Sequence, residues 1–148
     1  MEETRELNKS ELSQLLALYA HLHESDEPLP EREQVEAVWQ SICADSNLKC
    51  FGGFVDGNLI SSCTLSIIAN LTRGCRPYGL IENVVTHADL RRKGYGRRIM
   101  KHAMTYAWRR NCYKIMLLTG RKNEATYRFY ESVGFDRHAK QGFVAKPV

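Results

Sequence analysis

The sequence predicts an α/β fold, a single domain over residues 1–148 with a mixed sheet and the element order β-α-α-β-β-β-α-β-α-β. Three observations lead to this prediction. The segment Leu80–Met100 reads as a strand, a glycine-bearing turn and the start of a helix. An Asp56-Gly57 pair separates two strand-like segments, which is the pattern of a β-hairpin. A chain of 148 residues is also long enough to bury a sizeable core without disulfides.

The N-terminal part of the chain is expected to form one strand and two helices. Residues 3–7 read as a short strand. Ser10 precedes apolar residues that recur at helical spacing, so we expect it to cap the first helix. The acidic, proline-containing segment Glu24–Pro30 predicts a linker. A second helix is predicted over Glu31–Ala44, with four buried apolar side chains, Val35, Val38, Trp39 and Ile42.

Strands and helices are expected to alternate through the rest of the chain. The hairpin strands are predicted over Lys49–Phe54 and Leu59–Ile68, before a loop at Asn70–Pro77. The central strand should end near Thr86 and its helix near Asn111. The remaining predicted elements are a strand buried on both faces at Tyr113–Thr119, a helix at Asn123–Val133 with Gly134 as its C-terminal cap, and one or two closing strands within Phe135–Val148.

The turn after the central strand has the composition of an anion site. The run from Arg91 to Gly96 holds three cations and two glycines in six residues. Glycines at a helix start let the backbone approach an anion, and the free N–H groups there bind phosphate. Ile99 stands where a Rossmann turn needs its third glycine, and no Gly-Lys-Ser/Thr of a P-loop is present. The turn therefore predicts a diphosphate site of another kind.

Composition limits the functional classes. The net charge of +4 is modest, whereas Arg91–Arg98 alone carries five cations, which favours one anionic partner over a generally basic surface. The five cysteines are scattered and outside any metal-ligand spacing, which predicts reduced thiols in a cytoplasmic protein. No apolar run reaches 18 residues, and the N-terminus is acidic and polar. We therefore expect neither a membrane span nor a signal peptide.

Two motifs resemble those of the GNAT acyltransferases. Arg91, Gly94 and Gly96 match the signature R/Q-x-x-G-x-G/A. The segment NEATYRFYESVGF resembles the second GNAT motif, with Asn123, the aromatic pair Phe129-Tyr130 and the pair Gly134-Phe135 in register. The resemblance spans about Leu80 to Phe135, with the expected strand, helix and strand between the motifs. The segments IENVVT, NCYKIML and FYESVGF are further similar to parts of the glucosamine-6-phosphate N-acetyltransferases.

The resemblance implies a GNAT fold and acetyl-CoA as co-substrate, with no metal and with direct transfer to an amine in a ternary complex. The backbone of Val84, Val85 and Thr86 would pair with pantetheine and donate to the thioester carbonyl. The other residues that the resemblance assigns to the cofactor are Arg91, Arg92, Lys93, Gly94, Tyr95, Gly96, Arg97, Asn123 and Phe129. Asn123 also reads as a plain helix cap.

The resemblance also implies two catalytic residues. Tyr130 matches the family tyrosine near the thioester sulfur, and its phenol would protonate the leaving thiolate. Glu82, a carboxylate in an apolar strand, would accept the ammonium proton directly or through water. Their alternative readings are a core tyrosine and an outward-facing or ion-paired glutamate. His87 reads either as a proton relay or as a solvated turn histidine.

The acceptor is the least defined part of the prediction. In the family the acceptor wall comes from the first-helix connection and the loop before the central strand, here Tyr19–Leu29 and Asn70–Tyr78. Their charges suit a small zwitterionic or amino-sugar amine, and they equally suit solvated loops. The other functions left open are acetylation of a protein or peptide amine, acyl-CoA binding without turnover, and binding of nucleic acid by the basic run. We expect no nucleic-acid or membrane partner, and a homodimer is possible because many family members are dimers.

Overall fold

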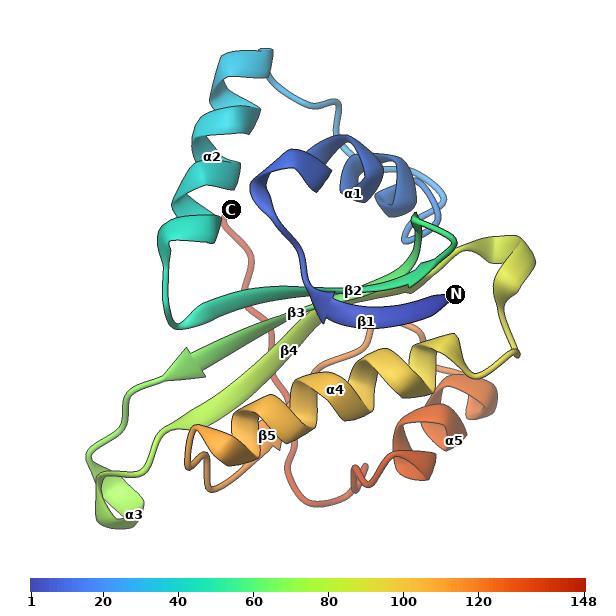
Figure 1. Cartoon of the computed structure of the whole chain (residues 1–148). Coiled ribbons are helices and arrows are strands. Elements are labelled where there is room, and N and C mark those ends of the chain that lie inside the picture. The colour runs from blue at the N-terminus through green and yellow to red at the C-terminus, as the bar shows by residue number, and fades with distance from the viewer. The chain divides into compact units, whose positions relative to one another are not determined.

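A computed structural model describes all 148 residues, which form two compact units, Met1–Met116 and Leu117–Val148. The first unit is a five-stranded mixed sheet in the order β1-β2-β3-β4-β5 (Figure 1). Neighbouring strands are antiparallel from β1 to β4, and β5 runs parallel to β4. The strands are β1 (Glu2–Glu6), β2 (Leu48–Val55), β3 (Asn58–Ile68), β4 (Tyr78–Thr86) and β5 (Ile115–Met116).

Helices cover both faces of this sheet. One face carries α1 (Leu12–Tyr19) and α2 (Arg32–Ala44), and the opposite face carries α4 (Tyr95–Arg109) (Figure 1). Shorter helical turns are η1 (Lys9–Glu11), α3 (Thr72–Cys75) and η2 (Ala88–Leu90). The second unit contains α5 (Glu124–Ser132). The α/β class and the parallel β4-α4-β5 crossover are therefore confirmed, and no helix combines the length and apolar character needed to cross a membrane.

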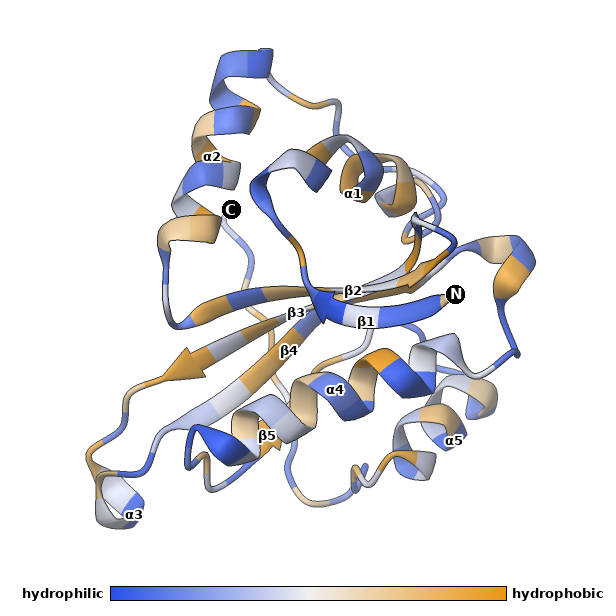
Figure 2. Ribbon diagram, in the orientation of Figure 1, coloured by the Kyte–Doolittle hydropathy of each residue, from blue (hydrophilic) through white to orange (hydrophobic).

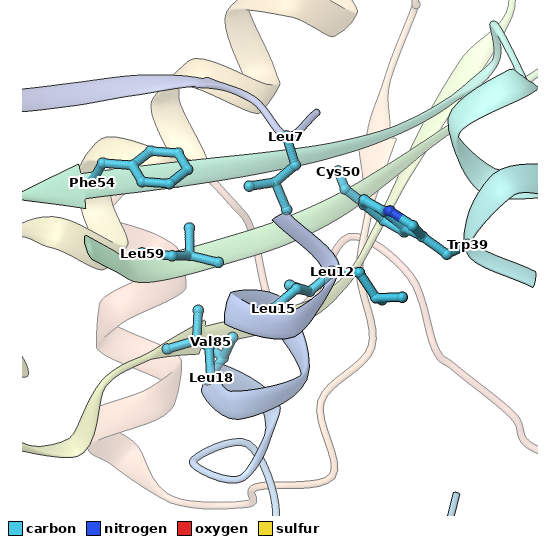
Figure 3. Packing of buried hydrophobic residues seen from close by; sticks show 9 residues of the cluster. All are labelled: Leu7, Leu12, Leu15, Leu18, Trp39, Cys50, Phe54, Leu59 and Val85. Carbon is cyan, nitrogen blue, oxygen red and sulfur yellow. The ribbon is translucent and has the colours of Figure 1, made fainter. Parts of the chain in front are cut away.

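Side chains that alternate along the strands build the two halves of the core. On the α1 and α2 face, Leu15, Leu18 and Trp39 belong to the cluster of buried residues that Figure 3 shows. On the other face, Phe51 lies under α4, with its ring 4.9 Å from His102 and 5.4 Å from Tyr106. Four side chains of α4, those of Ile99, Met100, Ala103 and Ala107, are completely buried, and Figure 2 shows hydrophobic and hydrophilic residues interleaved along this helix. Each large aliphatic side chain buried in this way stabilises the fold by about 1.5–3 kcal/mol.

The predicted hairpin is confirmed and has a simple local cause. Asp56 and Gly57 connect β2 to β3, and both have positive φ values, 48° and 81°. Two successive positive φ angles define the type I′ turn, whose twist matches that of the flanking strands.

Several element boundaries differ from prediction. Ser10 is not the helix cap, because Asn8 accepts the capping bond and forms a capping box with Glu11. Val38 is 54% exposed, since Trp39 occupies the core position of that turn of α2. The helix α4 ends at Arg109.

The two C-terminal strand predictions are also corrected. A strand buried on both faces was expected at Tyr113–Thr119, whereas the observed strand is Ile115–Met116 and its side chains are half-buried. The strand is short because only two residue pairs join it to β4. No strand forms within Phe135–Val148. The apolar residues there, Phe143 and Val144, are adjacent and thus give no alternating face, and they are 88% and 73% exposed.

Candidate functional site

The central strand β4 is interrupted by a β-bulge. Glu82 pairs with Thr64 and Val85 pairs with Ser62, so two residues of β4 face the single residue between them on β3. Asn83 takes the left-handed conformation, with φ 52°, which asparagine tolerates better than most side chains. Bulges re-aim the backbone and often lie beside active sites.

Beyond the bulge, the backbone of β4 offers hydrogen-bonding groups on its free edge. The N–H of His87 donates to the Ile60 carbonyl (2.8 Å), so His87 and Val85 face β3. Because successive residues of a strand point their polar groups to opposite edges, those of Val84 and Thr86 face the other edge. The strand β5 pairs only with Gly79 and Leu80, further back along β4. The N–H of Val84 therefore has no strand partner on that edge.

Glu82 is exposed and lies in register with Thr64. Thr64 Oγ1 lies 3.7 Å from Sγ of Cys50, a member of the core cluster on the α1 and α2 face, which places Glu82 on the same face. Glu82 makes no ion pair in the structure. A solvated carboxylate at this position is able to take up a proton from a bound ammonium group.

Sequence reasoning missed a polar contact at the bulge. The hydroxyl of Tyr19, the last residue of α1, lies near the side chains of Thr64 and Asn83, which favour its ionised form and partly oppose the effect of burial. Burial raises the pKa of this tyrosine to about 12, so the hydroxyl keeps its proton at neutral pH. In the sequence Tyr19 is the first residue of the predicted acceptor loop Tyr19–Leu29. An asparagine inside an apolar strand, Asn83, was the available signal for the bulge.

The turn that follows β4 leads directly into α4. Arg92 has φ 62° and Gly94 has φ 87°, and Gly94 is the residue before the first helical position. The first intrahelical bond runs from the N–H of Arg98 to the carbonyl of Gly94 (3.0 Å). No side chain caps the helix, so the N–H groups of Tyr95, Gly96 and Arg97 lack helical partners. These donors and the positive end of the helix dipole are suited to an anion.

The cations of this turn divide into two groups. Arg91 donates to the backbone carbonyls of Thr86 (3.2 Å) and His21 (2.8 Å), and Arg98 pairs with Glu2. Arg92, Lys93 and Arg97 are exposed and make no ion pair. The free cations are therefore the latter three, whereas the Arg91 side chain has a structural role that the motif did not predict.

The two loops predicted to form an acceptor wall lie at opposite ends of β4. The end of α1 contacts the segment after Thr86, through Nδ1 of His21 and the N–H of Ala88 (3.3 Å). The loop that holds α3 precedes Tyr78, and its Arg76 donates to the carbonyls of Asn111 and Cys112. A nine-residue strand spans roughly 30 Å, so the two loops of one chain do not share a wall.

A cavity between η1 and α2 lies apart from this site. It is lined mainly by apolar side chains and two thiols, and the indole N–H of Trp39 already donates to the Lys9 carbonyl (2.9 Å). The residues that line it are Glu6, Leu7, Asn8, Lys9, Trp39, Ile42, Cys43, Leu48 and Cys50. Its polar groups do not point to a ligand.

The second unit carries the other motif residues on α5. Asn123 Oδ1 accepts the N–H of Thr126 (2.9 Å), which is the helix-cap geometry. At the other end, Gly134 has φ 111°, its N–H donates to the Glu131 carbonyl (3.0 Å), and the N–H of Phe135 donates to that of Tyr130 (3.2 Å). These two bonds define a Schellman motif. The predicted C-terminal cap at Gly134 is confirmed.

Tyr130 lies in the last turns of α5 among other aromatic residues. Its ring centroid is 5.1 Å from that of Phe129 and 6.2 Å from that of Phe135, within the range of favourable aromatic pairs. Arg137 bonds to Glu124 and to Glu131, so it ties the two ends of the helix together.

Comparisons with known proteins agree on one family. The sequence matches the profile of the acetyltransferase (GNAT) family over residues 12–135. The glucosamine 6-phosphate N-acetyltransferase of Trypanosoma brucei brucei is 32% identical over 139 residues, which are 94% of this chain and 92% of that protein. The solved structure of a putative acetyltransferase from Agrobacterium tumefaciens has a TM-score of 0.91 at 42% identity, with 98% and 99% of the two chains covered. A solved acetyltransferase from Trypanosoma brucei has a TM-score of 0.82 at 28% identity, with 99% and 100% covered.

Proposed function

This chain belongs to the GNAT family and is an N-acetyltransferase, and we propose that it transfers the acetyl group of acetyl-CoA to the primary amine of a small phosphorylated amino sugar. The observation that carries the proposal is the end-to-end similarity to the trypanosomal glucosamine 6-phosphate enzyme, which leaves less than a tenth of either chain unmatched.

The turn between β4 and α4 supports the assignment of the co-substrate. The unpartnered N–H groups at the start of α4 and the cations Arg92, Lys93 and Arg97 match the charge of a diphosphate. We assign to this segment the diphosphate of CoA. The backbone groups of Val84 and Thr86 on the free edge of β4 are assigned to the pantetheine arm and the thioester carbonyl, whereas Val85, which pairs with Ser62 of β3, is not.

The chemistry is a direct acyl transfer. The amine nitrogen attacks the thioester carbonyl carbon. Negative charge then develops on the carbonyl oxygen, which accepts a hydrogen bond from the Val84 N–H. The ammonium proton passes to Glu82, directly or through water, as the carbon–sulfur bond breaks. Tyr130 then supplies a proton to the thiolate, and its phenolate regains a proton from solvent as Glu82 releases its own to solvent. A phenol suits this role because its pKa, about 10, is close to that of a thiol.

An acetylation screen tests the proposal. Thiol release from acetyl-CoA would be followed with glucosamine 6-phosphate, with glucosamine as the matched acceptor that lacks phosphate, and with polyamines, amino acids and peptides. We expect release and a product heavier by one acetyl group with the phosphorylated sugar, and a weaker response with glucosamine. Release no faster than hydrolysis with every amino sugar, or a preference for peptides, would refute this acceptor class.

A further inference from the structure

The Arg91 side chain joins two segments that are far apart in sequence. Its Nε donates to the Thr86 carbonyl (3.2 Å) at the end of β4, and its Nη2 donates to the His21 carbonyl (2.8 Å) just beyond α1. A guanidinium presents its donors in a rigid planar fork, so these two bonds fix the segments relative to each other.

The His21 ring makes a second connection to the same segment. Its Nδ1 accepts the N–H of Ala88 (3.3 Å), and its ring lies 4.1 Å from that of His87. His87 in turn accepts the N–H of Asp89 at Nδ1 (3.3 Å), which caps η2. We call these contacts among His21, His87, Ala88 and Arg91 the histidine clasp.

The histidine clasp connects a rigid part of the fold to an exposed one. The N–H of His21 bonds to the Leu18 carbonyl (3.0 Å), and the Leu18 side chain is 2% exposed in the core. The turn Arg91–Gly94 is exposed and contains the left-handed residue Arg92. Apart from the clasp, the turn has only the ends of β4 and α4 to hold it. The clasp therefore transmits the rigidity of the core to the turn.

We propose that His21 is a positioning residue for the acetyl-CoA site, which it serves by holding the turn between β4 and α4 in its binding conformation. The inference rests on the proposed function, because it takes this turn as the diphosphate site. This structural role of Arg91 differs from the role that the family resemblance implies for it, which is to bind the cofactor directly.

The clasp also gives the site a dependence on pH. Nδ1 of His21 accepts a hydrogen bond only while it carries no proton, and histidine is the side chain that changes charge between pH 5 and 8. His87 is the titratable group whose ring lies against that of His21, and Arg91 donates to the His21 backbone carbonyl. Asp89 bonds to His87 through its N–H, and His23 is next along the segment of His21. Protonation of His21 would remove the bond to Ala88 and place a cation beside Arg91. Mild acid should therefore loosen the turn.

Calorimetric titration of acetyl-CoA at pH 8.0 and pH 5.5 tests this inference with three variants. His21→Ala removes the ring, and we expect binding about tenfold weaker at pH 8.0, the effect of one lost net hydrogen bond. His21→Asn keeps an acceptor that cannot be protonated, and we expect binding close to wild type at pH 8.0. His23→Ala is the matched control, since His23 is exposed and outside the clasp, and we expect no change.

The comparison across pH separates positioning from simple stability. The 3′-phosphate of CoA also takes up a proton in this range, so the informative quantity is the affinity ratio of His21→Asn to wild type. We expect this ratio to rise several-fold from pH 8.0 to pH 5.5. Wild-type binding by His21→Ala, or a ratio that does not change with pH, would overturn the inference. A wild-type protein that binds no acetyl-CoA would instead refute the proposed function, and the inference with it.

Discussion

Replacing Gly94 by alanine tests how the turn between β4 and α4 is built. Gly94 has φ 87°, a conformation that costs a residue with a Cβ about 1–2 kcal/mol. No heavy atom lies within 4 Å of the position that a Cβ would take, so this cost is conformational and not a clash. Alanine at this position therefore introduces a defined strain without filling any space that the fold needs.

The conformational cost lowers one or both of two measurable quantities, the free energy of unfolding and the free energy of acetyl-CoA binding. If the turn keeps its shape, the whole cost lowers the free energy of unfolding, and for a chain of this size about 2–8 °C is lost from Tm. If the turn relaxes, the cost is recovered in the free protein and reappears when acetyl-CoA requires the original shape. A full relaxation would weaken binding about 5- to 30-fold. The losses in unfolding and binding free energy should therefore sum to about 1–2 kcal/mol.

Gly57→Ala is the matched control. Gly57 has φ 81° and an equally open Cβ position, and it lies in the β2–β3 hairpin instead of the turn. Thermal unfolding and calorimetric titration of acetyl-CoA should show a comparable Tm loss with unchanged affinity for Gly57→Ala. For Gly94→Ala we expect the conformational cost to be divided between a lower Tm and a weaker affinity for acetyl-CoA. Losses in unfolding and binding free energy that sum to well below about 1 kcal/mol for Gly94→Ala, or weaker acetyl-CoA binding by Gly57→Ala, would refute this reasoning.

Three further predictions concern single side chains. Tyr130→Phe should lower kcat at least tenfold with little change in acetyl-CoA affinity, because it removes the proposed acid and keeps the aromatic ring; unchanged turnover would exclude that role. Arg5 lowers the pKa of Glu11 by a two-point hydrogen bond, so the bond stabilises the fold above the unfolded pKa, near 4.5. Glu11→Gln should therefore lose about 1 kcal/mol at pH 7, and its deficit in denaturant unfolding should close as the pH falls from above the unfolded pKa through the lowered pKa of folded Glu11. Burial raises the pKa of Cys63 to about 12, so a thiol reagent at pH 8 should label exposed Cys75 at once and Cys63 only after unfolding; fast labelling of both would contradict this burial.

The elements predicted correctly from sequence are those with local causes. Asp56-Gly57 determines its turn through the φ angles that these residues tolerate, and Asn123 and Gly134 bound α5 through bonds within a few residues of each. The start of α4 follows from Gly94 for the same reason. In each case the residue type and its immediate neighbours are sufficient.

The features that were missed depend on contacts between distant residues. The Tyr19 hydroxyl lies near the side chains of Thr64 and Asn83 only because α1 packs on β3 and β4, and no local pattern predicts that packing. Arg91 is bound by the carbonyl of His21, which lies 70 residues earlier in the chain. The missing C-terminal strand has a similar cause, because whether an apolar segment pairs with a sheet depends on an available edge and not on its composition.

The second GNAT motif contains the residues that end α5 as well as the proposed acid. In the sequence Tyr130-x-x-x-Gly134-Phe135, the glycine supplies the left-handed residue of a Schellman motif, and the phenylalanine closes the bond to the Tyr130 carbonyl and packs its ring on that of Tyr130. These roles require glycine at its position and an apolar residue after it, but they require only an aromatic or apolar side chain at 130. Helix termination therefore uses the backbone carbonyl and the ring of Tyr130, both of which the phenylalanine variant keeps while it removes the phenol of the proposed chemistry.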